Sequence, residues 1–268
     1  MIRDITIGQY YANTSIVHEL DPRTKLMGVL VYVFTLFLVK NPFIYFVYLG
    51  IVLCLYYISK VPFSFMMKGL KGIIVLLIFT FCFRLICTPG TVVAQLWIFQ
   101  ITSEGIIKAV SLTSRIALMI LGASLLSYTT TPKEMSDGME KAFSGLERFH
   151  VPVHDMAVIV MIAFRFIPIL LEEINVLMDA QAARGVEFEK CSIWKKCKNV
   201  LTLLMPLFLS TVRRSSDLAM AMEARGYSGD KPVSKMYPLV YKKNDKIAYI
   251  GMCIFALVMI FFRVYCNL

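Results

Sequence analysis

Long apolar runs separated by short polar stretches dominate the chain. Five such runs stand out, at 26–39, 43–58, 73–88, 106–129 and 247–262. A helix needs about 20 apolar residues to cross the hydrocarbon core of a bilayer, and the flanks of a slightly short run can complete it. The pattern therefore predicts an all-α integral membrane protein with a bundle of about five transmembrane helices.

The first run is preceded by the nonapeptide HELDPRTKL at 18–26. Asp21 is a good helix N-cap, and Pro22 suits the first helical position because its missing N–H has no partner there in any case. A helix that begins here would place Arg23 and Lys25 at the cytoplasmic interface. A cap followed by a charged anchor explains most of this stretch without any further function.

The segment 89–105 interrupts the apolar runs and contains neither Lys nor Arg. It carries Pro89 and Gly90, followed by the aromatic residues Trp97 and Phe99. Loops on the outer side of a membrane are poor in basic residues, and aromatic residues collect at the interface. We expect an outside loop, with a short interfacial helix as one form that it could take.

The region 130–246 breaks the regular alternation of spans and loops. Its apolar runs at 156–171 and 200–212 are short, and the connector 184–198 between them is rich in Lys and Arg. If each run crossed the membrane once, this basic connector would lie outside, against the positive-inside rule. We therefore predict long amphipathic helices on the cytoplasmic side, and a re-entrant pair is the alternative.

This interpretation divides the chain into three parts. They are N-terminal transmembrane helices at 1–129, a cytoplasmic helical module at 130–246 and a C-terminal transmembrane helix at 247–268.

Composition supports a membrane protein and argues against a nucleic-acid-binding one. The 268 residues are 58% hydrophobic and 17% charged, whereas soluble domains average about 45–50% and about 25%. The net charge of +10 could indicate nucleic acid, but Lys and Arg lie mostly between apolar runs, as membrane topology requires. The expected surroundings are therefore a lipid bilayer, with no nucleic-acid partner.

Motifs for catalysis, nucleotide binding and metal binding are missing from the sequence. It contains no GxxxxGK[ST], HExxH or GxSxG, so we expect no bound ATP, no metal and no cofactor in this chain. Arg84, Arg115 and Arg165 lie in or near apolar runs, and the absence of acidic neighbours there favours a structural role over a substrate path. The chain is therefore not expected to be an enzyme.

One short motif, A-x-x-A-R-G, occurs twice, as AQAARG at 180–185 and AMEARG at 221–226. Glycine after a helix permits a left-handed C′ residue, and arginine in the last turn complements the helix dipole. The motif could thus be an ordinary helix end, repeated by chance. Two copies also suit docking, because guanidinium groups can pair bidentately with carboxylates of a partner that has two related grooves. The candidate docking residues are Ala183, Arg184, Gly185, Ala224, Arg225 and Gly226.

In the order and spacing of LDPRTKL at 20–26, AARG at 182–185 and EARG at 223–226, the whole chain resembles the transmembrane T component of energy-coupling factor (ECF) transporters. That family includes the cobalt-transport permeases. The resemblance implies that the two motifs end cytoplasmic coupling helices, which dock into two ABC-type ATPase subunits through Arg184 and Arg225. It also implies that these ATPases bind ATP and Mg²⁺, that a small membrane S component binds the vitamin or other micronutrient, and that the protein is a multi-pass component of a prokaryotic plasma membrane.

Two other classes of function remain to be weighed against this resemblance. A self-contained secondary transporter or channel would need intramembrane acidic residues or discontinuous helices near the midplane, and Pro168 and Pro206 are its only support. A membrane enzyme would need a catalytic constellation, which the sequence lacks. The imported substrate cannot be deduced from any of these residues.

Overall fold

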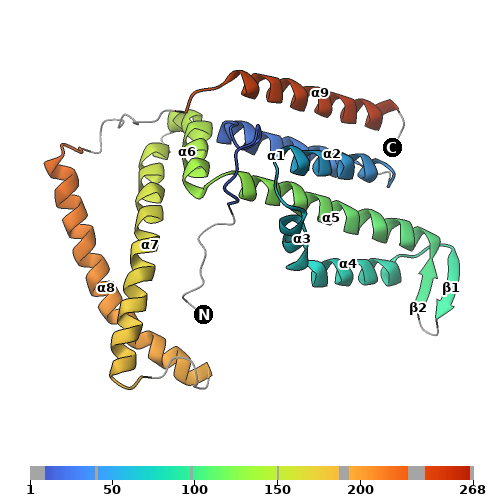
Figure 1. Ribbon diagram of the computed structural model, residues 1–268. Coiled ribbons are helices and arrows are strands. Elements are labelled where there is room, and N and C mark those ends of the chain that lie inside the picture. Colours follow the sequence, from blue (N-terminus) through green and yellow to red (C-terminus); the bar gives the residue numbers. More distant parts are fainter. Residues whose placement is uncertain are drawn as a thin grey trace. The chain divides into compact units, whose positions relative to one another are not determined.

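The computed structural model of the chain is almost entirely helical (Figure 1). It describes residues 10–39, 42–96, 99–149, 151–186, 193–228 and 239–265. The elements in chain order are α1 (Pro22–Leu38), α2 (Ile44–Ile58), α3 (Phe63–Lys71), α4 (Ile74–Cys87), β1 (Val92–Leu96), β2 (Phe99–Thr102), α5 (Ser103–Thr129), α6 (Pro132–Phe143), the 3-10 helix η1 (Ser144–Phe149), α7 (Val153–Ala183), α8 (Ile193–Ala224) and α9 (Lys243–Tyr265).

The chain separates into two compact units, which we describe one at a time. The bundle unit is made of the described residues within 8–139 and 239–268, and the long-helix unit of the described residues within 140–238. The predicted three-part division at 129/130 and 246/247 stays a prediction. The predicted placement of 130–246 on the cytoplasmic side stays a prediction, because no membrane accompanies the structure.

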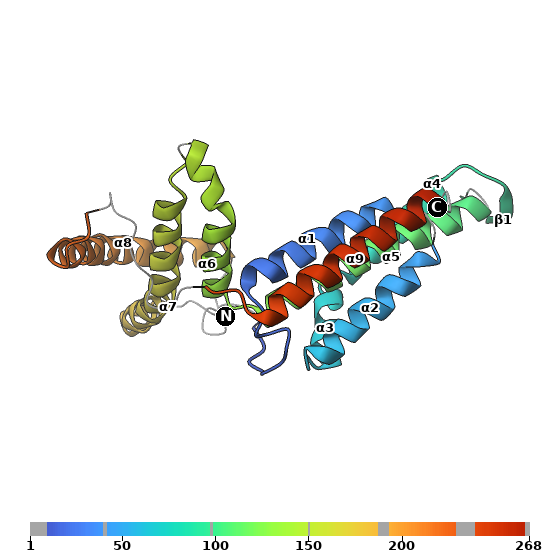
Figure 2. The same cartoon turned by 90° about the horizontal axis from the view of Figure 1, so that it is seen from above.

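In the bundle unit, helices formed by all five apolar runs pack side by side. Helix α1 packs against both α5 and α9, and α5 also packs against α2 and α4 (Figure 2). Within the described residues, α5 and Lys243–Arg263 of α9 are each long and apolar enough to cross a membrane alone. A third span is possible if α3 and α4, which meet at a bend of 59°, act as one. The all-α membrane fold is thus confirmed, whereas the number of about five spans stays a prediction.

Buried tyrosines link the helices of the bundle unit to the backbone of α5 and its neighbours. Tyr32 donates to Leu118 O at 3.0 Å, and Tyr56 donates to Leu121 O at 3.2 Å. A tyrosine ring supplies apolar contact area, but its hydroxyl group needs an acceptor once it is buried. Carbonyl groups along α5 provide these acceptors, so the tyrosines fix how α1 and α2 lie against α5.

Arg115 of α5 has the structural role that was favoured for it. Its guanidinium group donates to Val39 O at 2.6 Å and to the Tyr45 hydroxyl at 2.9 Å. Val39 is the C-cap of α1, where carbonyl groups lack partners within the helix. Arg115 therefore satisfies a helix end and ties α5 to the connection between α1 and α2.

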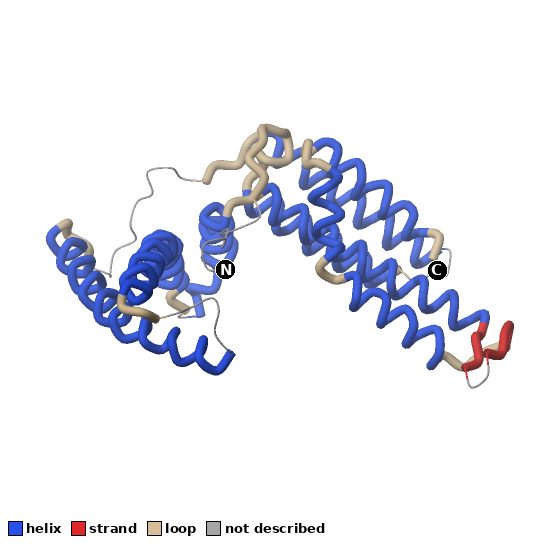
Figure 3. Tube along the Cα trace, turned by 60° about the horizontal axis from the view of Figure 1, so that its bottom comes forward, coloured by secondary structure: helices blue, strands red, loops and turns tan. Residues whose placement is uncertain are grey.

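The segment between α4 and α5 corrects one expectation. Instead of an interfacial helix it forms an antiparallel hairpin, in which Val92–Leu96 pairs with Phe99–Thr102 (Figure 3). Trp97 lies outside the described residues. The stretch VVAQLWIFQIT is rich in β-branched and aromatic residues, which favour strands. The interfacial helix, one of the forms expected for this outside loop, was wrong because these residues prefer paired strands.

In the long-helix unit, α7 and α8 continue through their internal prolines. Helix α7 has 31 residues and contains Pro168, and α8 has 32 residues and contains Pro206. The prediction of long helices in this region is therefore confirmed. At the start of α7, His154 Nδ1 lies 3.1 Å from Glu140 Oε1 of α6, which connects α7 to the helix before it.

Candidate functional site

The first A-x-x-A-R-G motif ends α7 in a Schellman motif. Arg184 is the C-cap residue, and Gly185 follows it with a φ of +87°. The Gly185 N–H donates to Ala182 O at 2.9 Å, and the Val186 N–H donates to Gln181 O at 3.1 Å. These two bonds satisfy carbonyl groups that the end of the helix would otherwise leave unpaired.

The second motif ends α8 in the same way, 41 residues later. Gly226 has a φ of +77°, and its N–H donates to Glu223 O at 2.9 Å. The Tyr227 N–H donates to Met222 O at 3.0 Å. The sequence-based interpretation of both glycines as left-handed C′ residues is confirmed, and the two helix ends are built identically.

All six motif residues are exposed at these helix ends, which we call the two tips. A Cβ added at Gly185 or Gly226 would meet nothing within 4 Å. The glycines are therefore required by the backbone conformation and not by a close neighbour. Each tip presents an exposed guanidinium group just after a small residue, an arrangement that another protein could approach closely. The two tips belong to different helices, and they do not form one composite site.

We expect the double substitution Gly185→Ala with Gly226→Ala to loosen both tips. A left-handed conformation costs a residue with a Cβ about 1–2 kcal/mol, so amide exchange at Val186 and Tyr227 should accelerate about 5- to 30-fold. Hydrogen–deuterium exchange with mass spectrometry measures this. The matched control is Gly145→Ala, at an open position in η1 without a positive φ, and it should change neither amide. Equal exchange in the double variant and the control would contradict the proposed glycine role.

The LDPRTKL stretch forms a second constellation, at the start of α1. Asp21 caps the helix by accepting from the Arg23 backbone N–H at 2.9 Å. It also accepts from Arg23 Nε at 3.1 Å and Nη2 at 3.0 Å, which makes a bidentate pair. Burial by itself raises the pKa of the Asp21 carboxyl, but these hydrogen bonds and the Arg23 charge outweigh burial and hold that pKa below its usual value. The predicted N-cap is confirmed.

The same constellation reaches the start of α9. The Asp21 backbone N–H donates to Asp245 Oδ1 at 2.8 Å, and the Lys242 N–H donates to Asp245 Oδ2 at 2.7 Å. Asp245 is only 1% exposed. The Arg23 guanidinium group lies 4.1 Å from the centre of the Tyr241 ring, within the range of a cation–π contact. The start of α1 and the start of α9 are therefore joined by a buried polar network.

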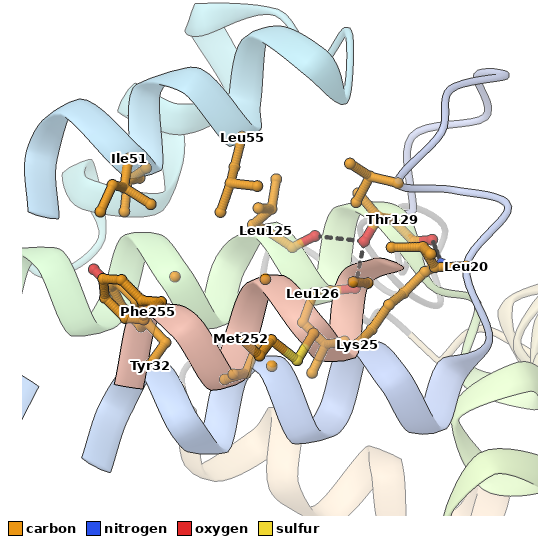
Figure 4. Close-up of a pocket in the computed structure, with 17 residues that line it drawn as sticks. Leu20, Lys25, Tyr32, Ile51, Leu55, Leu125, Leu126, Thr129, Met252 and Phe255 are labelled. Carbon is orange, nitrogen blue, oxygen red and sulfur yellow. Dashed lines mark hydrogen bonds between the residues drawn. The ribbon is translucent and has the colours of Figure 1, made fainter. Parts of the chain in front are cut away.

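Lys25 extends the network to the end of α5. Its Nζ donates to Thr129 O (Figure 4) and to His18 O, both at 2.9 Å. Thr129 is the last residue of α5, and the Lys25 side chain is almost fully buried. Lys25 thus joins three segments that are distant in sequence. The sequence indicates the charge at this position but contains no signal for its acceptors, because they are backbone carbonyl groups.

A cavity of about 430 Å³ opens beside Lys25, between α1, α2, α5 and α9 (Figure 4). Its lining is almost wholly apolar, with Met252 and Phe255 on one side and Ile51 and Leu55 on another. Lys25 is the single charged residue in that lining. Within the described residues, no group of three or more His, Cys, Asp or Glu side chains could hold a metal ion. The cavity therefore offers space for apolar groups.

Comparison with known proteins gives consistent results over nearly the full chain. Residues 13–236 match the family model described as cobalt transport protein, CbiQ. Three relatives share the name energy-coupling factor transporter transmembrane protein EcfT. The one from Acidaminococcus fermentans is 36% identical over 263 residues, or 98% of each chain. The one from Bacillus subtilis is 38% identical over 264 residues, or 98% of this chain and 100% of the relative. The one from Clostridium kluyveri is 40% identical over 264 residues, or 97% of this chain and 96% of the relative.

Proposed function

Because this chain belongs to the cobalt transport protein family, as a transmembrane T component of energy-coupling factor transporters, we propose that it transmits ATP-driven motion from two ABC-type ATPase subunits to a substrate-binding S component. The chain is thus a membrane-embedded transport subunit. Its partners, the relay of motion and its multi-pass placement in a prokaryotic plasma membrane are parts of the proposal.

The observation that carries the proposal is the pair of identical, exposed helix ends. Both tips end in a Schellman motif and present Arg184 or Arg225 to the surroundings. Two ATPase subunits that close on ATP offer two related surfaces, and each can receive one tip. Helices of 31 and 32 residues are long enough to carry a displacement over a distance of about 45 Å. Ala183 and Ala224 allow close approach beside each arginine.

The chemistry of the cycle is assigned to the partners. ATP and Mg²⁺ would bind to the ATPase subunits, since the sequence contains no phosphate-binding loop of its own. A small membrane S component would capture the vitamin or other micronutrient. This chain would be non-catalytic and would need no cofactor.

The alternative of a self-contained secondary transporter has lost its sequence support. That alternative would need intramembrane acidic residues or discontinuous helices near the midplane. Its support was Pro168 and Pro206, and both prolines lie inside helices that continue past them.

Reconstitution with single components left out tests the proposal. Liposomes that contain this chain, two ATPases and an S component should take up the micronutrient only when ATP is present. Omission of this chain should abolish uptake while substrate binding by the S component persists. Uptake by this chain alone, without ATP, would instead establish a secondary transporter.

A further inference from the structure

An ion pair joins the two long helices at one defined point. Arg214 Nε of α8 lies 3.2 Å from Glu173 Oε2 of α7. The Glu173 side chain is 17% exposed and the Arg214 side chain 44%. The Arg214 N–H is not aligned for a hydrogen bond with this oxygen, so the contact is an attraction between charges. Within the long-helix unit, we call this contact the joint.

The joint connects equivalent positions of the internal repeat. The same 41 residues separate Glu173 from Arg214 and Arg184 from Arg225. The neighbouring residues Glu172 and Arg213 also correspond in the repeat, but both are exposed. Opposite charges at the equivalent positions Glu173 and Arg214 attract α7 and α8 to each other at this one point.

The two tips lie at equal distances from the joint along their helices. Each C-cap arginine follows its joint residue by 11 positions, and neither intervening stretch contains Pro or Gly. At 1.5 Å per residue, each arm is about 16 Å long. The C-terminal ends of α7 (yellow) and α8 (darker orange) point away from each other in Figure 1. The joint is therefore a centre from which two arms of matched length lead to the two tips on separate sides.

We propose that the Glu173–Arg214 ion pair sets the spacing of the two tips, so that both fit the two related surfaces of an ATPase dimer at once. The inference rests on the proposed function, and it assigns positioning roles to two residues that contact neither ATPase. Two binding sites linked at a fixed span gain affinity only when the spacing matches the partner.

A charge pair is suited to this task because apolar packing alone tolerates sliding. Much of the apolar surface of both helices is exposed, including Val176 on α7 and Leu209 and Val212 on α8. Dispersion and hydrophobic contacts have little directional preference. Opposite charges at one pair of positions favour a single register of the two helices. A shifted register would bring like charges together and is disfavoured by their repulsion.

Distance measurement between the tips tests the joint directly. Spin labels at the equivalent, exposed positions Ala180 and Ala221 in the cysteine-free full chain, held in lipid nanodiscs, should give one narrow distance distribution. Glu173→Arg or Arg214→Glu alone should broaden and shift it. The double exchange Glu173→Arg with Arg214→Glu should restore it, and the control Glu172→Arg at the exposed neighbouring position should leave it unchanged. Unchanged distances in the single variants, or no restoration in the double exchange, would overturn the joint.

A second measurement separates this inference from the proposed function. In the complete transporter, Glu173→Arg should lower micronutrient uptake per ATP hydrolysed by about fivefold or more, the lower range of coupling between distant sites. The double exchange should restore it. Normal coupling in Glu173→Arg would remove the positioning role and leave ATPase docking intact. A distance that depends on the pair in a chain that binds no ATPase would keep the joint and overturn the proposed function.

Discussion

Reversal of both tip arginines, Arg184→Glu with Arg225→Glu, is expected to abolish association with the ATPase subunits and leave membrane insertion intact. Loss of one partner from a buried charge pair costs on the order of 2–5 kcal/mol, and a reversal adds repulsion. Each tip alone should therefore lose at least about 30-fold in affinity. Both arginines are exposed and lie beyond the regular part of their helices, so the fold should survive. Co-purification in mild detergent measures the association.

The matched control for this prediction carries the same change in net charge on the same two helices. Arg165→Glu with Arg213→Glu alters exposed arginines of α7 and α8 that do not lie at the tips, and it should retain the ATPases. A double tip reversal that holds its ATPases as tightly as this control would show that the tips are ordinary helix ends.

Replacement of the buried Lys25 by methionine should have the largest effect on stability. Methionine resembles lysine in length, but it leaves Thr129 O and His18 O without their donor. An unsatisfied buried carbonyl group costs about 1–3 kcal/mol, so two should cost roughly 2–6 kcal/mol. For a chain of this size, the apparent melting temperature should fall by roughly 4–24 °C. A thermal melt of the purified protein in detergent measures this.

Lys108→Met is the control for Lys25→Met. Lys108 lies on α5, its side chain is 54% exposed, and its Nζ is 3.6 Å from Glu104 Oε2. Such exposed pairs contribute about 0–1 kcal/mol, so the melting temperature should barely move. If Lys25→Met and Lys108→Met have the same melting temperature, the network at the start of α1 does not stabilise the bundle unit. Because Lys25 lies away from the tips in the sequence, neither substitution should alter the charges offered to the ATPases.

Local signals in the sequence predicted seven of the helices, whereas α3, α6 and η1 were not predicted. Apolar runs marked α1, α2, α4, α5 and α9, and Asp21 and Pro22 marked the start of α1. The two Ala-Arg-Gly motifs marked the ends of α7 and α8. Each of these signals depends on neighbouring residues only, through burial in lipid, capping or a left-handed glycine.

Features that depend on distant residues could not be predicted in the same way. The acceptors of Lys25 include a carbonyl group 104 residues away, and backbone acceptors have no residue preference that a sequence could reveal. One partner of Asp245 is the Asp21 backbone N–H group, 224 residues away. The Glu173–Arg214 pair is an intermediate case. The complementary charges stand in the sequence at the spacing of the motif, and comparison of the two repeats beyond their last six residues would have found them.

Whether this chain works as a coupling subunit with two ATPases can be tested directly by one measurement. The tagged full-length protein is purified in mild detergent from its native membranes, and the proteins that accompany it are identified by mass spectrometry. We predict two ABC-type ATPase subunits and one small, very hydrophobic membrane protein, whose identity would also indicate the imported micronutrient. A lone species of 30.5 kDa that transports in liposomes without ATP would contradict the account.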